Sequence, residues 1–214
     1  MESYRGMTGF MRLPGGRGGG KYRGMTYVVR PVRAEEWRAV RELRLAALRD
    51  PVAPLAFLDT YEAAAARPDA FWRERTEGAA EGSGTARQFV AVASGGRLVG
   101  SVTALVERRG ADVVFGEVPE EDQTHLVGVY LRPEARGVGV AEKLLWAAVD
   151  WSWSLSDPVV RRVRLYVHER NARAAALYRK AAFRPTGRAL PVEGGPGAVE
   201  QEYEMRRPSA CAGN

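Results

Sequence analysis

The segment 127–149 constrains the fold of this 214-residue chain most, because a strand pattern, a glycine turn and a helix pattern follow one another within it. Residues 127–131 are apolar and include β-branched side chains, which is typical of a buried strand. Pro133 ends the pattern, because proline cannot donate a hydrogen bond to a sheet ladder. Residues 136–141 then lead directly into a helical pattern. The apolar face of that helix comprises Val140, Ala141, Leu144, Leu145 and Ala148.

A strand, a glycine turn and a helix in this order direct several free backbone N–H groups and the positive end of a helix dipole toward one point. Such a site suits an anion, and best of all a phosphate. Two common phosphate motifs do not fit this stretch. The P-loop pattern GxxxxGK[ST] is missing from it, and the dinucleotide pattern G-x-G-x-x-G fails because Glu142 stands where the third glycine belongs.

The turn instead matches the pattern R/Q-x-x-G-x-G/A. Its six residues are Arg136, Gly137, Val138, Gly139, Val140 and Ala141. Together with the preceding strand, the turn closely resembles the pyrophosphate-binding motif of the GNAT family of N-acetyltransferases, which bind acetyl-CoA. The motif alone leaves an ordinary strand–helix turn as the alternative.

A second segment, 171–183, strengthens the resemblance. It is similar to the family pattern N-x-x-A-x-x-L-Y-x-x-x-G-F, with matches at Asn171, Ala174, Leu177, Tyr178 and Phe183. It departs at Ala182, where the family usually has a glycine that shapes the end of a helix. The resemblance is specific over residues 124–183 and extends more loosely to about 26 and 206.

The order of patterns is β-αα-βββ-α-β-α-ββ, which predicts an α/β protein with helices on both faces of a sheet. This is the order of the GNAT fold, so the resemblance implies a mixed, mostly antiparallel sheet in a single domain. The expected strands are 26–32, 88–93, 98–106, 124–131, 162–167, 183–190 and 199–205. The expected helices are 34–49, 59–76 with an interruption near Pro68, 142–149, and one within 171–183.

The two ends of the chain differ from the rest in composition. Residues 1–25 are expected to form a flexible, basic, glycine-rich tail, residues 26–207 the acetyltransferase domain, and residues 208–214 a C-terminal tail. Five basic residues and Glu2 give residues 1–25 a net charge of +4 out of +6 for the whole chain, so the remainder carries +2. Nucleic acid is therefore not an expected partner, although binding through the basic tail is one alternative.

The environment of the protein follows from what the sequence lacks. It has one cysteine, Cys211, which excludes an internal disulfide framework. It also has no apolar run of membrane-spanning length and no signal-peptide core. We therefore expect a cytoplasmic protein without a membrane partner or a metal, and a homodimer stays open.

The resemblance implies how acetyl-CoA would bind. The backbone N–H groups of 136–141 would hold the pyrophosphate, with charge added by the Arg136 side chain. The backbone of Val129, Tyr130 and Leu131 would bind the pantetheine arm like an added strand and polarise the thioester. Asn171 would fix the cofactor or the helix that carries Tyr178, and a helix N-cap is its compatible alternative role.

The catalytic groups also follow from the resemblance. Tyr178 would protonate the departing thiolate, and a core tyrosine is the alternative. His125 lies six residues before Leu131, where many relatives carry a glutamate that deprotonates the amine. Imidazole can do this work, and a strand-end histidine without a role is the alternative. The acidic residues of 117–122 are expected to be mostly solvated, but they are the next source of a base.

The acceptor is an amine that the sequence does not identify. In this family its pocket is built from variable segments, here about 50–75 and 188–198. Aromatic residues of the first segment are expected in the core, with substrate contact as the alternative. They are Phe57, Tyr61, Phe71 and Trp72. The alternative to an N-acetyltransferase is a non-catalytic acyl-CoA-binding regulatory module of the same fold.

Overall fold

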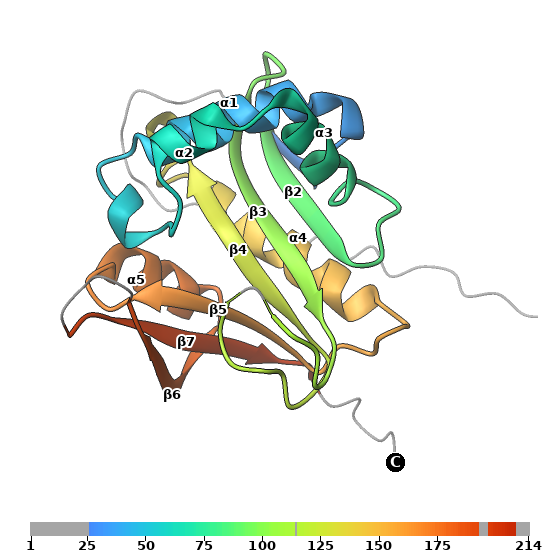
Figure 1. The fold of residues 1–214 in the computed structure, drawn as a ribbon, viewed down its shortest axis with the longest axis vertical. Helices are drawn as coiled ribbons and strands as arrows, with labels where there is room; N and C mark the ends of the chain where they lie inside the picture. Colours follow the sequence, from blue (N-terminus) through green and yellow to red (C-terminus); the bar gives the residue numbers. More distant parts are fainter. Residues whose placement is uncertain (1–25, 114, 193–196, 209–214) are drawn as a thin grey trace, which may run out of the picture.

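The computed structural model describes residues 26–113, 115–192 and 197–208 (Figure 1). The predicted tail 1–25 lies outside the described residues, as do residues 209–214 of the predicted C-terminal tail. None of the described helices is long and apolar enough to cross a lipid bilayer.

Seven strands form one mixed sheet in the order β1-β2-β3-β4-β5-β7-β6. Neighbouring strands are antiparallel except for β4 and β5, which run parallel. The strands are β1 Tyr27–Pro31, β2 Ala86–Ala93, β3 Leu98–Glu107, β4 Gln123–Leu131, β5 Arg162–His168, β6 Arg184–Pro191 and β7 Val199–Arg206. The predicted fold class and order of elements are confirmed.

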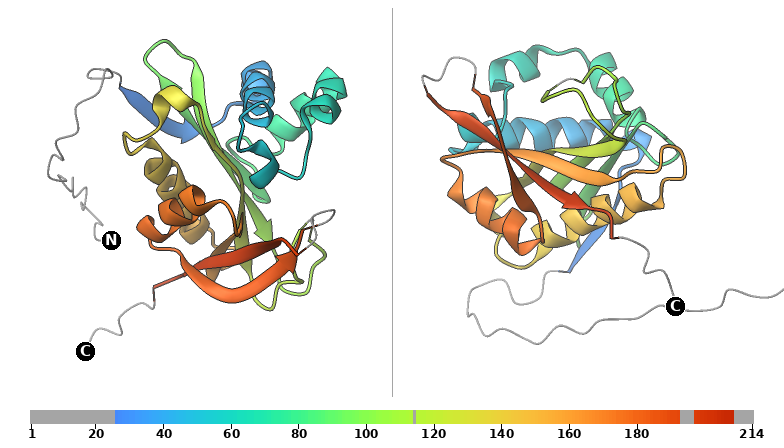
Figure 2. Two further views of the ribbon diagram at one scale, coloured as in Figure 1. Left: turned by 90° about the vertical axis from the view of Figure 1, so that its left-hand side faces the viewer. Right: turned by 90° about the horizontal axis from the view of Figure 1, so that it is seen from below.

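Helices cover both faces of the sheet (Figure 2). On one face lie α1 (Trp37–Leu48), α2 (Tyr61–Ala66) and α3 (Asp69–Glu77), and on the other lie α4 (Val140–Ser154) and α5 (Ala172–Lys180). The predicted interruption near Pro68 is confirmed, because Pro68 immediately precedes α3. Proline favours such a start, since the first N–H of a helix has no internal partner in any case.

Alternation along the strands divides the side chains between two layers. In β5, Val163, Leu165 and Val167 pack with α4 and α5 in the larger core. The other face of the same strand carries Arg162 and Arg164, which are also buried. One face of β5 is therefore an ordinary apolar core, whereas the other buries charge.

The core under α4 holds the glycine turn in place. Leu144 and Leu145 of α4 are fully buried against strand residues such as Val102 and Leu126. Truncating one of these leucines to alanine would cost roughly 2–5 kcal/mol. The start of α4 is thus fixed relative to the end of β4.

Candidate active site

The sheet opens between its two parallel strands. β4 pairs with β5 only from Gln123 to His125. Beyond His125, β4 continues to Leu131 and β5 to His168 without further pairing, and Figure 1 shows the two strands diverging. Backbone groups of residues 126–131 that face this gap have no ladder partner among the described residues. They are therefore available to an extended ligand that adds itself as a strand.

A bulge lies in β4 beside this gap. Ser101 opposes Tyr130 and Thr103 opposes Val127, so β4 has one more residue than β3 between these pairs. Gly128, within that interval, has a φ of +64°. A side chain is strained in this region of φ, whereas glycine is not. The bulge interrupts the β3–β4 register at the level where the strands part.

The glycine turn has the geometry that its sequence predicts. Gly137 and Gly139 have φ values of +78° and +81°. Gly139 is the N-cap of α4, and no side chain caps this helix. A Cβ atom at either glycine would meet nothing within 4 Å, so backbone conformation rather than crowding selects glycine here. Because no described side chain caps α4, N–H groups at its start can bind an anion.

The Arg136 side chain ties this turn to two other segments. Its Nε donates to the carbonyl oxygen of Leu131 at 2.9 Å, and its guanidinium pairs with Asp50, just after α1. Burial acts to raise the pKa of Asp50, but the Val52 N–H and Arg136 outweigh it, and the pKa lies below its usual value. The sequence suggested that the positive charge of Arg136 would bind a pyrophosphate. In the structure, Asp50 neutralises much of that charge.

Tyr178 lies in the core under α5, 7% exposed, with its ring near those of Phe183 and Tyr203. Burial raises the pKa of its phenol far above the usual value, and the carboxylate of Glu200 raises it further. No described residue hydrogen-bonds its hydroxyl group. The phenol thus keeps its proton throughout the physiological range, as a proton donor must.

Asn171 caps α5. Its Oδ1 accepts from the N–H of Ala174 at 3.1 Å, which is the N-cap geometry predicted as one of its two roles. Its Nδ2 donates to the Leu55 carbonyl oxygen at 3.4 Å. The cap therefore also connects the Tyr178 helix to the segment that follows α1.

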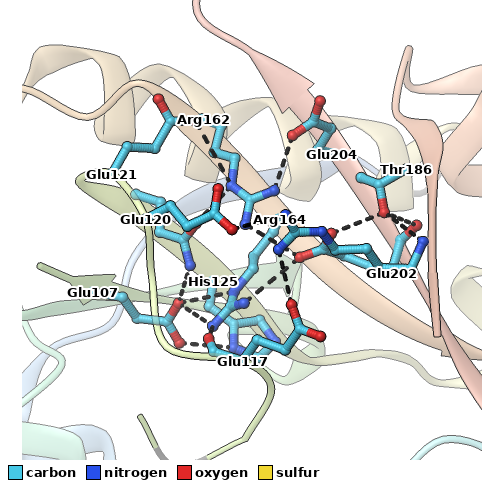
Figure 3. A network of polar contacts seen from close by, with 12 residues as sticks. Glu107, Glu117, Glu120, Glu121, His125, Arg162, Arg164, Thr186, Glu202 and Glu204 are labelled. Carbon is cyan, nitrogen blue, oxygen red and sulfur yellow. Dashed lines mark hydrogen bonds and ion pairs between the residues drawn. The ribbon is translucent and has the colours of Figure 1, made fainter. Parts of the chain in front are cut away.

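His125 lies at the point where β4 and β5 part, and it is 3% exposed. Its Nδ1 is 3.0 Å from Oε1 of Glu107, the last residue of β3 (Figure 3). Burial acts to raise the pKa of Glu107, but hydrogen bonds and charges from His125, Arg164 and Gln123 outweigh it and lower the pKa. An ionised carboxylate only accepts hydrogen bonds, so the Nδ1 of His125 carries the proton. The lone pair of a neutral imidazole is then on Nε2, which no described residue hydrogen-bonds.

Glu107 and His125 belong to a polar network that joins strands β3, β4, β5, β7 and β6 and is largely buried (Figure 3). Arg164 binds Glu107 at 2.7 Å and lies 3.6 Å from Glu202. Arg162 binds Glu202 at 3.3 Å and Glu204 at 3.0 Å. These charges are buried with partners on both sides, which keeps the cost of desolvation tolerable.

The acidic stretch 117–122, the alternative source of a base, is occupied by partners. Glu117 and Glu120 pair with Arg188 at 2.8 and 2.9 Å. Glu121 pairs with Arg206 at 2.8 Å. The side chains of Glu117 and Glu120 are nevertheless 53% and 75% exposed, so these two carboxylates are solvated as the sequence predicted, and the ion pairs are an addition to that prediction.

Sequence reasoning missed two carboxylates. Glu107 lies just outside the expected strand 98–106, but in the structure it ends β3 and faces His125. Glu200 lies in β7, opposite His168 of β5, and forms no ion pair with a described residue. Burial raises the pKa of Glu200 to about 7. Neither position carries a local signal, because each depends on strand register and burial.

The structure also describes residues for which the sequence left alternatives open. Trp72 is 1% exposed and lies in a small core with Trp37, against which Phe57, Tyr61 and Phe71 pack partly buried. All four aromatic residues thus contribute to this core, and contact with a substrate stays a prediction for them. Within the described ranges, no group of three or more histidine, cysteine or acidic side chains is arranged to hold a metal ion.

Comparisons with known proteins agree with this geometry. A search of curated proteins found no match. Among solved structures, a phosphinothricin acetyltransferase from Sinorhizobium meliloti in complex with AcCoA aligns with a TM-score of 0.64 and 20% identity, covering 88% of this chain and 92% of that one. Arabidopsis thaliana NAA60 in complex with acetyl-CoA aligns with a TM-score of 0.61 and 19% identity, covering 85% and 98%.

A third neighbour is the PaiA N-acetyltransferase from Thermoplasma acidophilum in complex with coenzyme A, with a TM-score of 0.60 and 15% identity over 85% and 99% of the two chains. At these identities the likeness shows the fold. The model of the acetyltransferase (GNAT) family matches residues 37–183, which is more than half of the chain. The chain therefore belongs to the acetyltransferase (GNAT) family.

Proposed function

We propose that the chain is an N-acetyltransferase that transfers the acetyl group of acetyl-CoA directly to a primary amine. The observation that carries the proposal is the gap between β4 and β5, which opens at His125 and leads to the uncapped glycine turn before α4. Neighbours with the same fold were crystallised with acetyl-CoA or coenzyme A. A site for an extended arm followed by a site for an anion fits such a ligand.

In this proposal the backbone of Val129, Tyr130 and Leu131 pairs with the pantetheine arm. The N–H groups of residues 136–141 bind the pyrophosphate, and Asn171 supports the helix that carries Tyr178. When bound, acetyl-CoA supplies an activated thioester carbon. The protein must then accept a proton from the amine nitrogen and donate a proton to the thiolate sulfur.

The first proton leaves the amine as its nitrogen attacks the thioester carbon. Nε2 of His125 accepts it, directly or through one water, while Glu107 holds Nδ1–H and stabilises the resulting imidazolium. The new C–N bond forms as the C–S bond breaks. The products of this step are the amide and the CoA thiolate. The positive charge gained by His125 is balanced by the Glu107 carboxylate.

The second proton goes to sulfur. A thiolate whose conjugate acid has a pKa of about 8.5 accepts a proton from an ordinary phenol of about 10 at modest cost. Burial raises the pKa of Tyr178 above that ordinary value, so full transfer is more costly here. We expect Tyr178 to act first as a hydrogen-bond donor to the developing thiolate, with the proton following as the site rehydrates.

Binding of acetyl-CoA is tested at the turn. Gly139→Asp should weaken acetyl-CoA binding about tenfold or more, because it places a carboxylate where the N–H groups face the pyrophosphate. Gly110→Asp is the matched control: its φ is +72°, and a Cβ there also meets nothing within 4 Å. Calorimetry should show a loss for the first variant alone. Equal affinity in wild type and Gly139→Asp would remove the turn as the phosphate site.

Catalysis is tested with CoA release from a panel of small amines, polyamines, amino acids, aminoglycosides and peptides. His125→Ala should lower kcat by roughly 10²–10⁴ without weakening acetyl-CoA binding, and an acceptor that is already neutral at the assay pH should lose less. Glu107→Gln should act in the same direction, since a neutral amide no longer fixes the tautomer. An unchanged kcat in His125→Ala would transfer the role to Glu200, to the 117–122 segment or to water.

Tyr178→Phe keeps the packing of the ring and removes only the hydroxyl group. It should lower kcat by a similar factor at unchanged cofactor affinity. Because the pKa of Tyr178 is raised, wild-type activity should show no loss from its ionisation up to at least pH 10. Tight acetyl-CoA binding with no CoA release from any amine would favour the regulatory-module alternative.

A further inference from the structure

A small cavity under α1 and α3 collects polar groups that have no partner. Its volume is about 30 Å³, and it lies between these helices and strands β2 to β4. A cavity of this size has room for about two waters, which is also the space that a carboxylate fills. We call it the arginine cavity. Its polar lining consists of Arg44, Trp72, Arg75, Gln88, Ser101 and Thr103.

Unused donors mark this cavity. The Nε1 atom of Trp72 is buried and has no hydrogen-bond partner, although the side chain is 1% exposed. Arg75 forms no ion pair or hydrogen bond with a described residue. The side chains of Gln88, Ser101 and Thr103 likewise make no hydrogen bond within the described part of the chain. Trp72, Ser101 and Thr103 are buried, whereas Gln88 is half-buried and Arg75 is exposed. Buried polar groups are normally paired, so the three buried ones favour a polar occupant of the cavity.

Positive charge around the cavity exceeds the negative charge. Asp59 is shared by Arg67 at 3.0 Å and Arg44 at 3.7 Å, and Arg75 adds a third guanidinium nearby. Burial lowers the pKa of Arg44 to about 10, and the neighbouring charge of Arg75 contributes. Asp59 alone therefore faces three guanidinium groups. An anion would supply a further negative partner through charge-assisted hydrogen bonds.

The cavity touches the strand that the proposed function assigns to acetyl-CoA. Gly128, at the β4 bulge, and Tyr130 both line it. A molecule anchored in the cavity therefore lies beside β4, the strand whose other edge borders the gap toward β5. An acceptor held at one end by the arginines can present its amine to this strand.

We propose that the acceptor carries an anionic group, in the first place a carboxylate, that binds in the arginine cavity between Arg44, Arg75 and the indole N–H of Trp72. The acceptor class is thus an amino acid or a similar amino acid-like amine. This proposal rests on the proposed function, because it places that anionic group relative to the thioester strand. A phosphonate shares the same chemistry and is separated by the test.

The test compares matched acceptors. Each amino acid, for example L-methionine or L-phenylalanine, is paired with its amide, and 2-aminoethylphosphonate is paired with ethanolamine. The α-amine of an amino acid amide is the less basic one and is more readily neutral, so ionisation alone favours the amide. Wild type should nevertheless prefer the carboxylate by roughly 10-fold or more in kcat/KM, because the amide lacks the charge that the arginines need.

Arg75 supplies the decisive variant, because it lines the cavity but is exposed as a whole residue and belongs to none of the hydrophobic core clusters. Arg75→Gln should reduce the preference to less than about threefold, and Arg75→Lys should restore part of it by keeping the charge. Arg73→Gln is the control, since Arg73 lies on the same helix but packs over Trp37 outside the cavity. It should keep the full preference.

Binding is measured separately by calorimetric titration of the CoA-loaded protein with each member of a pair. This readout decides the proposal even if no acceptor is turned over. Carboxylate binding that Arg75→Gln weakens and Arg73→Gln does not supports it. Equal or tighter binding of the amides overturns it, whereas CoA release from those amides would leave the acetyltransferase function standing. Tighter binding of the phosphonate would assign the cavity to a doubly charged group.

Discussion

Two pairs of arginines lie on the same face of the sheet, one buried and the other partly exposed, and their surroundings differ. Arg162 and Arg164 are held by Glu107, Glu202 and Glu204 at 2.7–3.6 Å. Arg44 and Arg75 have only a share of Asp59 among the described residues. The positive charge of the first pair is neutralised by carboxylates of the protein itself. The guanidinium groups of the second pair exceed the negative charge of their described partners, and this difference separates the structural network from the proposed binding site.

The largest effect should come from breaking the closed network. Glu202 is 1% exposed and accepts from Arg162, Tyr166 and Thr186. Glu202→Ala should lower the free energy of unfolding by roughly 3–5 kcal/mol, because it leaves buried guanidinium charge unpaired. Urea denaturation measures this.

The comparison predicts the opposite behaviour for the open pair. Arg75→Gln should change the free energy of unfolding by no more than about 0.5 kcal/mol, since Arg75 has no described ion pair to lose. The two variants measured side by side give the sharpest contrast. Equal losses would mean that Arg75 is structural and that the arginine cavity is not a binding site.

Glu200 tests the comparison from the acidic side, with an intermediate effect. It precedes Glu202 and Glu204 on the same face of β7 but has no cationic partner in the described chain, and burial raises its pKa from 4.5 to about 7. The folded protein therefore keeps a proton that the unfolded chain loses. The stabilising contribution is fully present below pH 4.5 and is lost as the pH rises to about 7.

Urea denaturation at several pH values between 4.5 and 7.5 measures the Glu200 contribution. Wild type should lose stability over this window relative to Glu200→Gln, whose side chain stays neutral. Parallel stability curves for the two proteins would show that Glu200 is ionised and solvated in the native state.

A small effect is expected from backbone strain rather than from charge. Ala182 has a φ of +72° at the exposed end of α5, in the position where the family pattern has glycine. Ala182→Gly should raise the free energy of unfolding by about 0.5–1 kcal/mol, because relief of left-handed strain exceeds the added entropy of the unfolded chain. Thermal melting detects it as a small rise in Tm. A fall in Tm would mean that the alanine is not strained.

Local patterns were sufficient for the elements of the fold and for the turn before α4. Gly137 and Gly139 are adjacent to their own strand and helix, so the sequence displays the whole arrangement. The helix within 171–183 was also predictable, including its cap at Asn171. These features depend on neighbours within a few positions along the chain.

The remainder of the site depends on contacts between distant segments. In the β3–β4 ladder His125 pairs with Leu105, and Glu107 is two residues further along β3 on the same face, so the two side chains meet. Neither segment by itself indicates this register. Arg75 of α3 likewise lines a cavity with Gly128 of β4. The charges of these residues were visible in the sequence, but whether each found a partner was not.

The parting of β4 and β5 also has a consequence for how the protein unfolds. The β1–β4 and β5–β7 parts of the sheet are joined through a ladder of three residue pairs, from Gln123 to His125. A ligand that fills the gap as an extended strand would bridge these parts and couple their opening. We therefore expect amide hydrogen exchange in β5 and β7 to slow together with exchange in β4 when the gap is filled, so that the occupied sheet opens as one cooperative unit.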